Sequence, residues 1–136
     1  MSKVYLGFDF GLRRIGVAVG QDITMTAAPL CTLNAKNGNP DWDTIEKLIH
    51  EWRPNDLIIG IPLNMDGSEM PVTKPARRFA KQLHSHFDIP VHTTDERLTT
   101  KAAREEVYGR GGSKALRKKA IDEVAAQLIL ETWMHS

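Results

Sequence analysis

Apolar residues alternate with polar or small residues twice within the first 20 positions of the chain. Leu6 and Phe8 belong to the first alternation, and residues 15–19 carry the second. A period of two is typical of β-strands, and the polar connection at 11–14 contains a glycine that can take a positive φ. The pattern predicts an opening β-hairpin. Asp9 then ends the first strand on the face opposite Leu6 and Phe8, where it either caps the turn or needs a partner or a metal ion.

After the hairpin, strand patterns and helix patterns follow one another. Asn39 is a suitable helix cap, and Pro40 suits the first helical position. A short apolar run without alternation, residues 57–62, is typical of a strand covered on both sides. The predicted elements are a strand over 27–33, a helix from 39 to about 53, a strand over 57–62, a helix from about 73 to 87, a strand over 89–94, a helix from about 99 or 100, and a last helix after 119.

These elements predict an α/β fold with a five-stranded mixed sheet and helices on both faces, of the ribonuclease H kind. The 136 residues are the size of one domain, so we expect a single domain over 1–136. The chain is 41% hydrophobic and 26% charged, as in soluble proteins, and lacks the run of about 20 apolar residues that spans a membrane. The single cysteine, Cys31, cannot form an internal disulfide. We expect a cytoplasmic protein.

Positive charge is concentrated locally, although the formal net charge is only +1. Attraction to a polyanion must therefore come from local patches. The stretch from Gly109 to Lys119 holds three glycines and no acidic residue, which predicts a flexible basic loop. Such a run is either solvated surface or a phosphate-binding site, and we favour phosphate binding. The expected nucleic-acid-binding residues, including two in the opening hairpin, are Arg13, Arg14, Arg110, Lys114, Arg117, Lys118 and Lys119.

Three carboxylates occupy positions where an apolar element ends or packs. Asp9 and Glu96 end predicted strands, and Asp122 lies at the inner edge of the last apolar helix. If these elements meet, the three carboxylates converge, and closely spaced carboxylates repel one another unless a cation neutralises them. Oxygen ligands of this kind select Mg²⁺ or Mn²⁺. Beside a basic loop, such a cluster predicts metal-assisted hydrolysis of phosphodiester bonds.

The chain also resembles the YqgF family, in four segments that follow that family's order from about Val4 to Trp133. The segments are Asp9–Ala18, Ile59–Pro62, Asp95–Thr100 and Asp122–Ala126. The resemblance implies a ribonuclease H-like nuclease, described either as a Holliday-junction resolvase or as the enzyme that trims the 5′ end of pre-16S ribosomal RNA. It also implies a metal-binding catalytic set at Asp9, Glu96 and Asp122. Asp95 is either a helper of that set or a helix cap, and Arg13 stands where the family more often has lysine.

We therefore expect a nuclease that uses Mg²⁺ or Mn²⁺ on structured nucleic acid. On the resemblance alone, we favour processing of the pre-16S rRNA 5′ end in ribosome biogenesis. The alternative is a Holliday junction resolvase, which should dimerise to cut two strands symmetrically, whereas an RNA-trimming enzyme can work as a monomer.

Two other classes of function stay open. A nucleotide-dependent phosphotransferase shares the Asp-x-Gly turn, but its fold closes two domains over the nucleotide. A non-catalytic nucleic-acid binding or ribosome-assembly module would keep the basic loop without needing three converging carboxylates.

Overall fold

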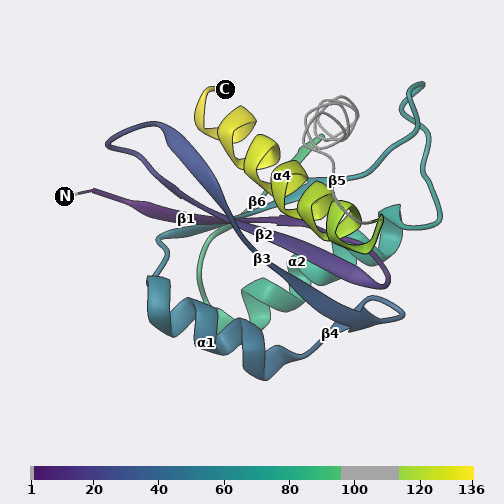
Figure 1. Cartoon of the computed structure of the whole chain (residues 1–136), viewed down its shortest axis with the longest axis horizontal. Coiled ribbons are helices and arrows are strands. Elements are labelled where there is room, and N and C mark those ends of the chain that lie inside the picture. The colour runs from purple at the N-terminus through teal and green to yellow at the C-terminus, as the bar shows by residue number, and fades with distance from the viewer. Residues whose placement is uncertain (1, 96–113) are drawn as a thin grey trace.

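Six strands form one mixed β-sheet, and helices cover both of its faces (Figure 1). The computed structural model describes residues 2–95 and 114–136, with side chains in the last helix from residue 121 onward. The strands are β1 (Val4–Asp9), β2 (Arg14–Gln21), β3 (Thr26–Lys36), β4 (Asn39–Pro40), β5 (Asp56–Ile61) and β6 (Val91–Asp95), and the helices are α1 (Trp42–Trp52), α2 (Thr73–Phe87) and α4 (Lys114–Met134).

The strands lie in the order β4-β3-β2-β1-β5-β6. β1 to β4 pair antiparallel in sequence order, whereas β5 pairs parallel with both β1 and β6. The predicted opening hairpin and the central position of β5 are confirmed. Because β1, β5 and β6 run in the same direction, their carboxyl ends lie at one edge of the sheet, which also receives the β1–β2 turn and the end of β3.

The strand β4 is one strand more than the sequence predicted. Asn37 and Gly38 have positive φ values of 52° and 84°, which suit a two-residue hairpin turn. This turn folds Asn39 and Pro40 back against the end of β3. The prediction that Asn39 caps the next helix was therefore wrong: the cap is Asp41, whose carboxylate accepts a hydrogen bond from the backbone N–H of Asp43.

Two apolar layers sandwich the sheet. The larger layer packs α1 and α2 against one face, and its centre contains Phe8, Ile59 and Phe79. The smaller layer packs α4 against the other face through Ile58, Ile129 and Leu130. Alternation along the strands assigns each side chain to one layer. Helices on both faces are thus confirmed, and α4 lies alone on its face among the described helices (Figure 1).

The last helix begins earlier than the sequence predicted. α4 starts at Lys114, so residues 114–119 of the expected basic loop are helical. These residues continue the helix because they include alanine, leucine, lysine and arginine, which all have high helix propensity. The rest of the expected loop and the helix expected near Thr99 or Thr100 lie outside the described residues. Across the described ranges, no helix is both long and apolar enough to cross a membrane.

Candidate functional site

Asp9 lies at the carboxyl end of β1, in the middle of the sheet. Its pairing partners are Gly16 on β2 and Gly60 on β5. Two residues earlier on the same face, a side chain at Gly7 would meet Leu130 of α4. Because side chains alternate along a strand, Asp9 also belongs to the face that α4 covers. The carboxylate therefore lies on the α4 side of the sheet, opposite the layer that buries Leu6 and Phe8.

Asp122 reaches the same place from α4. A methyl group built on Gly16 would lie 2.0 Å from the carbonyl oxygen of Asp122 and 3.0 Å from its Cβ. Any side chain at Gly16 would push the helix away, so glycine permits this close approach. Gly16 is directly opposite Asp9 in the β1–β2 ladder. Gly16 is therefore next to both carboxylate residues: Asp9 is its partner in the neighbouring strand, and Asp122 lies over it in α4.

The carboxylate of Asp122 forms an ion pair with the guanidinium of Arg14. Arg14 Nε donates to Asp122 Oδ2 at 2.7 Å, and the Asp122 side chain is 18% exposed. Burial raises the pKa of Asp122 above its ordinary value, and the Arg14 hydrogen bond and charge oppose that rise. The negative charge of Asp122 is therefore costly at this position unless positive charge lies beside it.

Polar contacts further along α4 fix its position on β3. Thr32 Oγ1 donates to Glu123 Oε2 at 2.9 Å, and Gln127 Nε2 donates to the carbonyl oxygen of Ala27 at 3.0 Å. Neither contact was predicted from the sequence, and nor was the pairing of Arg14 with Asp122. Gly16 did give a signal, because an isolated glycine in a strand pattern often marks the close approach of another backbone.

The remaining predicted site residues are placed only in part. Glu96 and Arg110 lie outside the described residues. Lys114, Arg117, Lys118 and Lys119 lie in the first turns of α4. Arg13 is exposed in the β1–β2 turn. Asp95 ends β6 opposite Ile61, whose side chain belongs to the layer beneath α1 and α2, so alternation places Asp95 on the other face from Asp9.

The donor atoms at this edge are carboxylate oxygens, which suit Mg²⁺ or Mn²⁺. Asp9 and Asp122 supply two of them. Among the described side chains, no group of three or more His, Cys, Asp or Glu residues is arranged to hold a metal ion. The predicted third carboxylate, Glu96, lies outside the described ranges and follows directly after the last residue of β6. The residues present fit a divalent cation of this class.

Comparison with known proteins gives one consistent family. A family model described as "RuvX: Holliday junction resolvase" matches residues 3–136. A relative from Actinobacillus pleuropneumoniae serotype 5b (strain L20), named "Putative pre-16S rRNA nuclease", is 52% identical over 136 residues, which are 100% of this chain and 99% of the relative. Relatives of the same name from Legionella pneumophila (strain Lens) and Cronobacter sakazakii (strain ATCC BAA-894) are each 53% identical, over 96% and 98% of this chain and 94% and 96% of their own lengths.

Solved structures with the same fold are more distant in sequence. T. thermophilus RuvC in complex with a Holliday junction substrate superposes with a TM-score of 0.56 at 16% identity, covering 98% of this chain and 97% of that chain. The yeast mitochondrial Holliday junction resolvase Ydc2 also gives 0.56, at 14% identity, covering 96% and 77%. At these identities the likeness shows the fold alone, and it confirms the predicted ribonuclease H-like architecture.

Proposed function

The chain belongs to the RuvX family, and we propose that it is a metal-dependent nuclease that processes the 5′ end of precursor 16S ribosomal RNA. The observation that carries this proposal is the meeting of Asp9 and Asp122 on either side of Gly16, at the carboxyl edge of the sheet. The choice of RNA rests on the curated relatives, which share more than half of their residues with this chain over nearly their whole length.

The catalytic carboxylates in this proposal are Asp9, Asp122 and Glu96. They would hold Mg²⁺ or Mn²⁺, which when bound polarises the phosphate and lowers the pKa of a coordinated water. Asp9 is positioned by the β1 ladder, and Asp122 is positioned by the contact between α4 and Gly16. Arg14 favours the ionised form of Asp122, because its guanidinium partly opposes the burial that raises the carboxylate pKa.

The proposed substrate-binding residues are basic. Four of them lie in the first turns of α4, the helix that also carries Asp122: Lys114, Arg117, Lys118 and Lys119. They precede Asp122 by three to eight positions in the same helix. Together with Arg110, Arg13 and Arg14, they would hold the phosphates of the strand. We assign the activity to a single domain over residues 1–136 and expect it in the cytoplasm, where ribosomal RNA is processed.

The proposal is tested by cleavage of a precursor 16S rRNA 5′ fragment with purified protein, with Mg²⁺, with Mn²⁺ and with chelator. We expect metal-dependent cleavage that is lost in Asp9→Asn. Asp43→Asn is a matched control, because Asp43 is exposed on α1 and contributes no group to the proposed site. Metal-independent cleavage, or cleavage that survives Asp9→Asn, would contradict the assignment of the carboxylates.

A second candidate is resolution of four-way DNA junctions, and the description of the matching family model favours it. A resolvase should act as a dimer, because it must cut two strands symmetrically. The same assay with a synthetic four-way junction, combined with sedimentation analysis, separates the two functions. Symmetric junction cleavage by a dimer, with the RNA fragment left intact, would replace the RNA assignment with the DNA one.

A further inference from the structure

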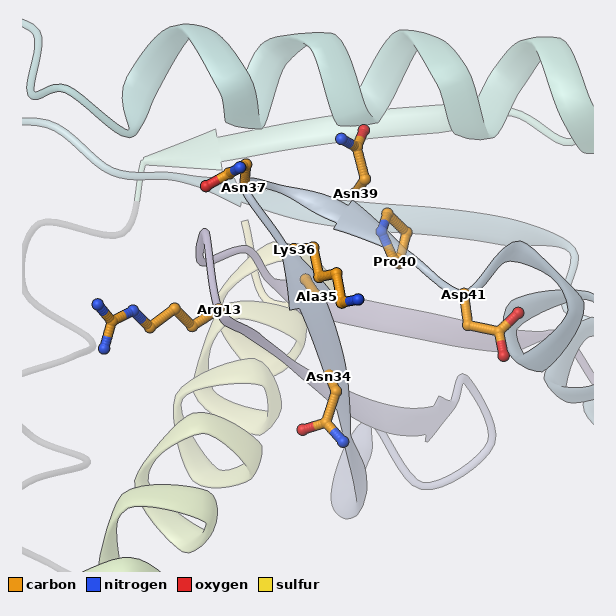
Figure 2. Close-up of a pocket in the computed structure, with 8 residues that line it drawn as sticks. All are labelled: Arg13, Asn34, Ala35, Lys36, Asn37, Asn39, Pro40 and Asp41. Carbon is orange, nitrogen blue, oxygen red and sulfur yellow. The ribbon is translucent and has the colours of Figure 1, made fainter.

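A groove is lined chiefly by the hairpin of β3 and β4 (Figure 2), whose turn lies at the same edge of the sheet as the candidate carboxylates. Its volume is about 880 Å³, within the range of roughly 300 to 1,000 Å³ that accommodates drug-sized ligands, so a nucleotide of a substrate strand fits. Its polar lining residues are Arg13, Asn34, Lys36, Asn37, Asn39 and Asp41.

The β2–β3 ladder connects the groove to the carboxylate site. Asn34 lies directly opposite Arg14 in the β2–β3 ladder, and Arg14 holds Asp122. Paired residues share a face, so Asn34 is on the α4 side of the sheet. Lys36 follows on the same face and is paired with Asn39 of β4. A row of polar positions therefore extends across this edge, from Asp9 on β1 to Asn39 on β4.

The hairpin that forms the groove is held firmly to the β1–β2 turn. The backbone N–H of Ala35 donates to the Arg13 carbonyl at 2.8 Å, and that of Gly38 donates to the Leu12 carbonyl at 2.9 Å. Pro40 is buried, and with Ala35 it forms the apolar part of the groove. A ligand in the groove would therefore meet a preformed surface, and little ordering of the protein would oppose its binding.

The side chains of the groove are suited to a nucleic-acid strand. Asn34, Asn37 and Asn39 are exposed, and their carboxamides have no hydrogen-bond partner among the described residues. Lys36 lies among them in Figure 2. The acidic member, Asp41, has both carboxylate oxygens engaged at the start of α1, by the Asp43 N–H and the Thr44 hydroxyl. The polar groups left to meet a ligand are amides, which donate and accept hydrogen bonds, and cations.

We propose that this groove binds a single-stranded segment of the RNA substrate next to the scissile phosphate, with Lys36 on a backbone phosphate and Asn34 and Asn39 on ribose 2′-hydroxyls. The 2′-hydroxyl both donates and accepts, as a carboxamide does, and it distinguishes RNA from DNA. The proposal rests on the proposed nuclease function and adds the surface that selects the strand.

The test measures binding of a fluorescein-labelled single-stranded RNA and of DNA of the same sequence by anisotropy, in an Asp9→Asn background that prevents cutting. We expect the triple variant Asn34→Ala, Lys36→Ala, Asn39→Ala to raise the Kd for RNA about tenfold, as for the loss of one phosphate contact and two hydrogen bonds. The Kd for DNA should rise less, because DNA offers Lys36 a phosphate but no 2′-hydroxyl to the amides. Asn37 is left unchanged, since its positive φ shapes the turn.

Lys47→Ala is the matched control, because Lys47 is exposed on α1 and lines a separate hollow with Glu46 and His50. It should leave both affinities unchanged. Unchanged RNA binding in the triple variant, or equal losses for RNA and DNA, would overturn the proposal. The double variant Asn34→Ala, Asn39→Ala, checked for an unchanged thermal melt, provides the same test if the triple variant does not fold. The proposed nuclease function is tested separately: if it is wrong, the wild-type protein does not cleave the RNA fragment.

Discussion

The guanidinium of Arg14 lies 2.7 Å from the carboxylate of Asp122, a residue 108 positions away in the sequence. The pair joins the opening hairpin to the last helix beside Asp9. Within it, burial and positive charge act in opposite directions on the Asp122 carboxylate, and burial is the larger effect. The first two predictions follow from that balance.

Asp122→Asn should abolish cleavage, by about a thousandfold or more, while leaving the metal-free protein at least as stable as wild type. The folded-state pKa of Asp122 is raised, so its contribution to stability is present below the unfolded-state pKa and lost as pH rises through the folded-state value. Asparagine removes this loss at neutral pH. Thermal melts in chelator, measured from pH 3 to pH 8, should show a smaller fall with rising pH in the variant.

Added Mn²⁺ should stabilise wild type more than Asp122→Asn, because a ligand that binds the folded state stabilises it by mass action. Asp56→Asn is the control, since Asp56 is hydrogen-bonded to His92 at the amino end of β5, and the candidate metal site is at the carboxyl edge of the sheet. A variant of Asp122 that melts lower in chelator and keeps the full response to Mn²⁺ would remove Asp122 from the metal site.

Arg14→Ala should destabilise the protein by about 1 to 2 kcal/mol, because it leaves a largely buried carboxylate without its ion-pair partner. Arg13→Ala is the natural control, because Arg13 is the next residue in the chain and its side chain is exposed. Its expected effect on the free energy of unfolding is within about 0.5 kcal/mol. Urea unfolding measures both. In the double variant Arg14→Ala, Asp122→Asn much of the loss should be recovered, and a purely additive loss would show that the ion pair is not the cause.

Gly16→Ala should displace α4 and cost about 1 to 3 kcal/mol, since the new methyl group would meet the Asp122 backbone. Cleavage should fall with it, because Asp122 moves. Gly20→Ala is a matched control on the same strand, where the methyl group would meet the end of the Leu130 side chain at 2.9 Å. That side chain can move, so the cost should be smaller. Equal destabilisation by the two changes would contradict the special role of Gly16.

Replacing Arg117, Lys118 and Lys119 together by alanine should weaken RNA binding by a factor that shrinks as salt rises. About one counterion is released for each phosphate contact, so the slope of log Kd against log salt should fall by about three units if all three cations bind phosphates. Anisotropy titrations at several salt concentrations measure the slope. An equal loss of affinity at low and high salt would rule out a role in phosphate binding.

Much of the fold could be read from the sequence because local patterns coincide with tertiary packing. Alternation identified β1 and β2, and the unbroken apolar run identified β5. The strand β4 was missed because two residues carry no periodicity; the signal was the Asn37–Gly38 pair, which favours a two-residue hairpin turn. The start of α1 was misplaced for a related reason. Asn39 and Asp41 are both suitable caps, but Asn39 is part of the hairpin, so Asp41 caps the helix.

For the site, the sequence identified which carboxylates are unusual but not what surrounds them. Asp122 was noticed because a charged residue interrupts an apolar helical face. Its partner Arg14 could not be predicted, since pairing across 108 positions depends on where α4 crosses the sheet. The groove of β3 and β4 was equally hidden, because the sequence pattern of Asn34, Lys36 and Asn39 is that of an ordinary loop until the hairpin places them on one face.

The contact between α4 and Gly16 sets the position of Asp122 by shape. Gly7 and Gly20 also lie beneath α4, where added side chains would meet Leu130 at 2.9 Å. Gly16 meets the helix backbone, Gly7 meets Leu130 Cβ and the Ala126 carbonyl oxygen, and Gly20 meets side-chain ends. A helix that slid or rolled would lose the close fit at Gly16 and Gly7. Steric exclusion is indifferent to ionic strength, whereas the attraction between cations and phosphates is not. Salt should therefore tune how tightly a strand is held while the distance between Asp9 and Asp122 stays constant.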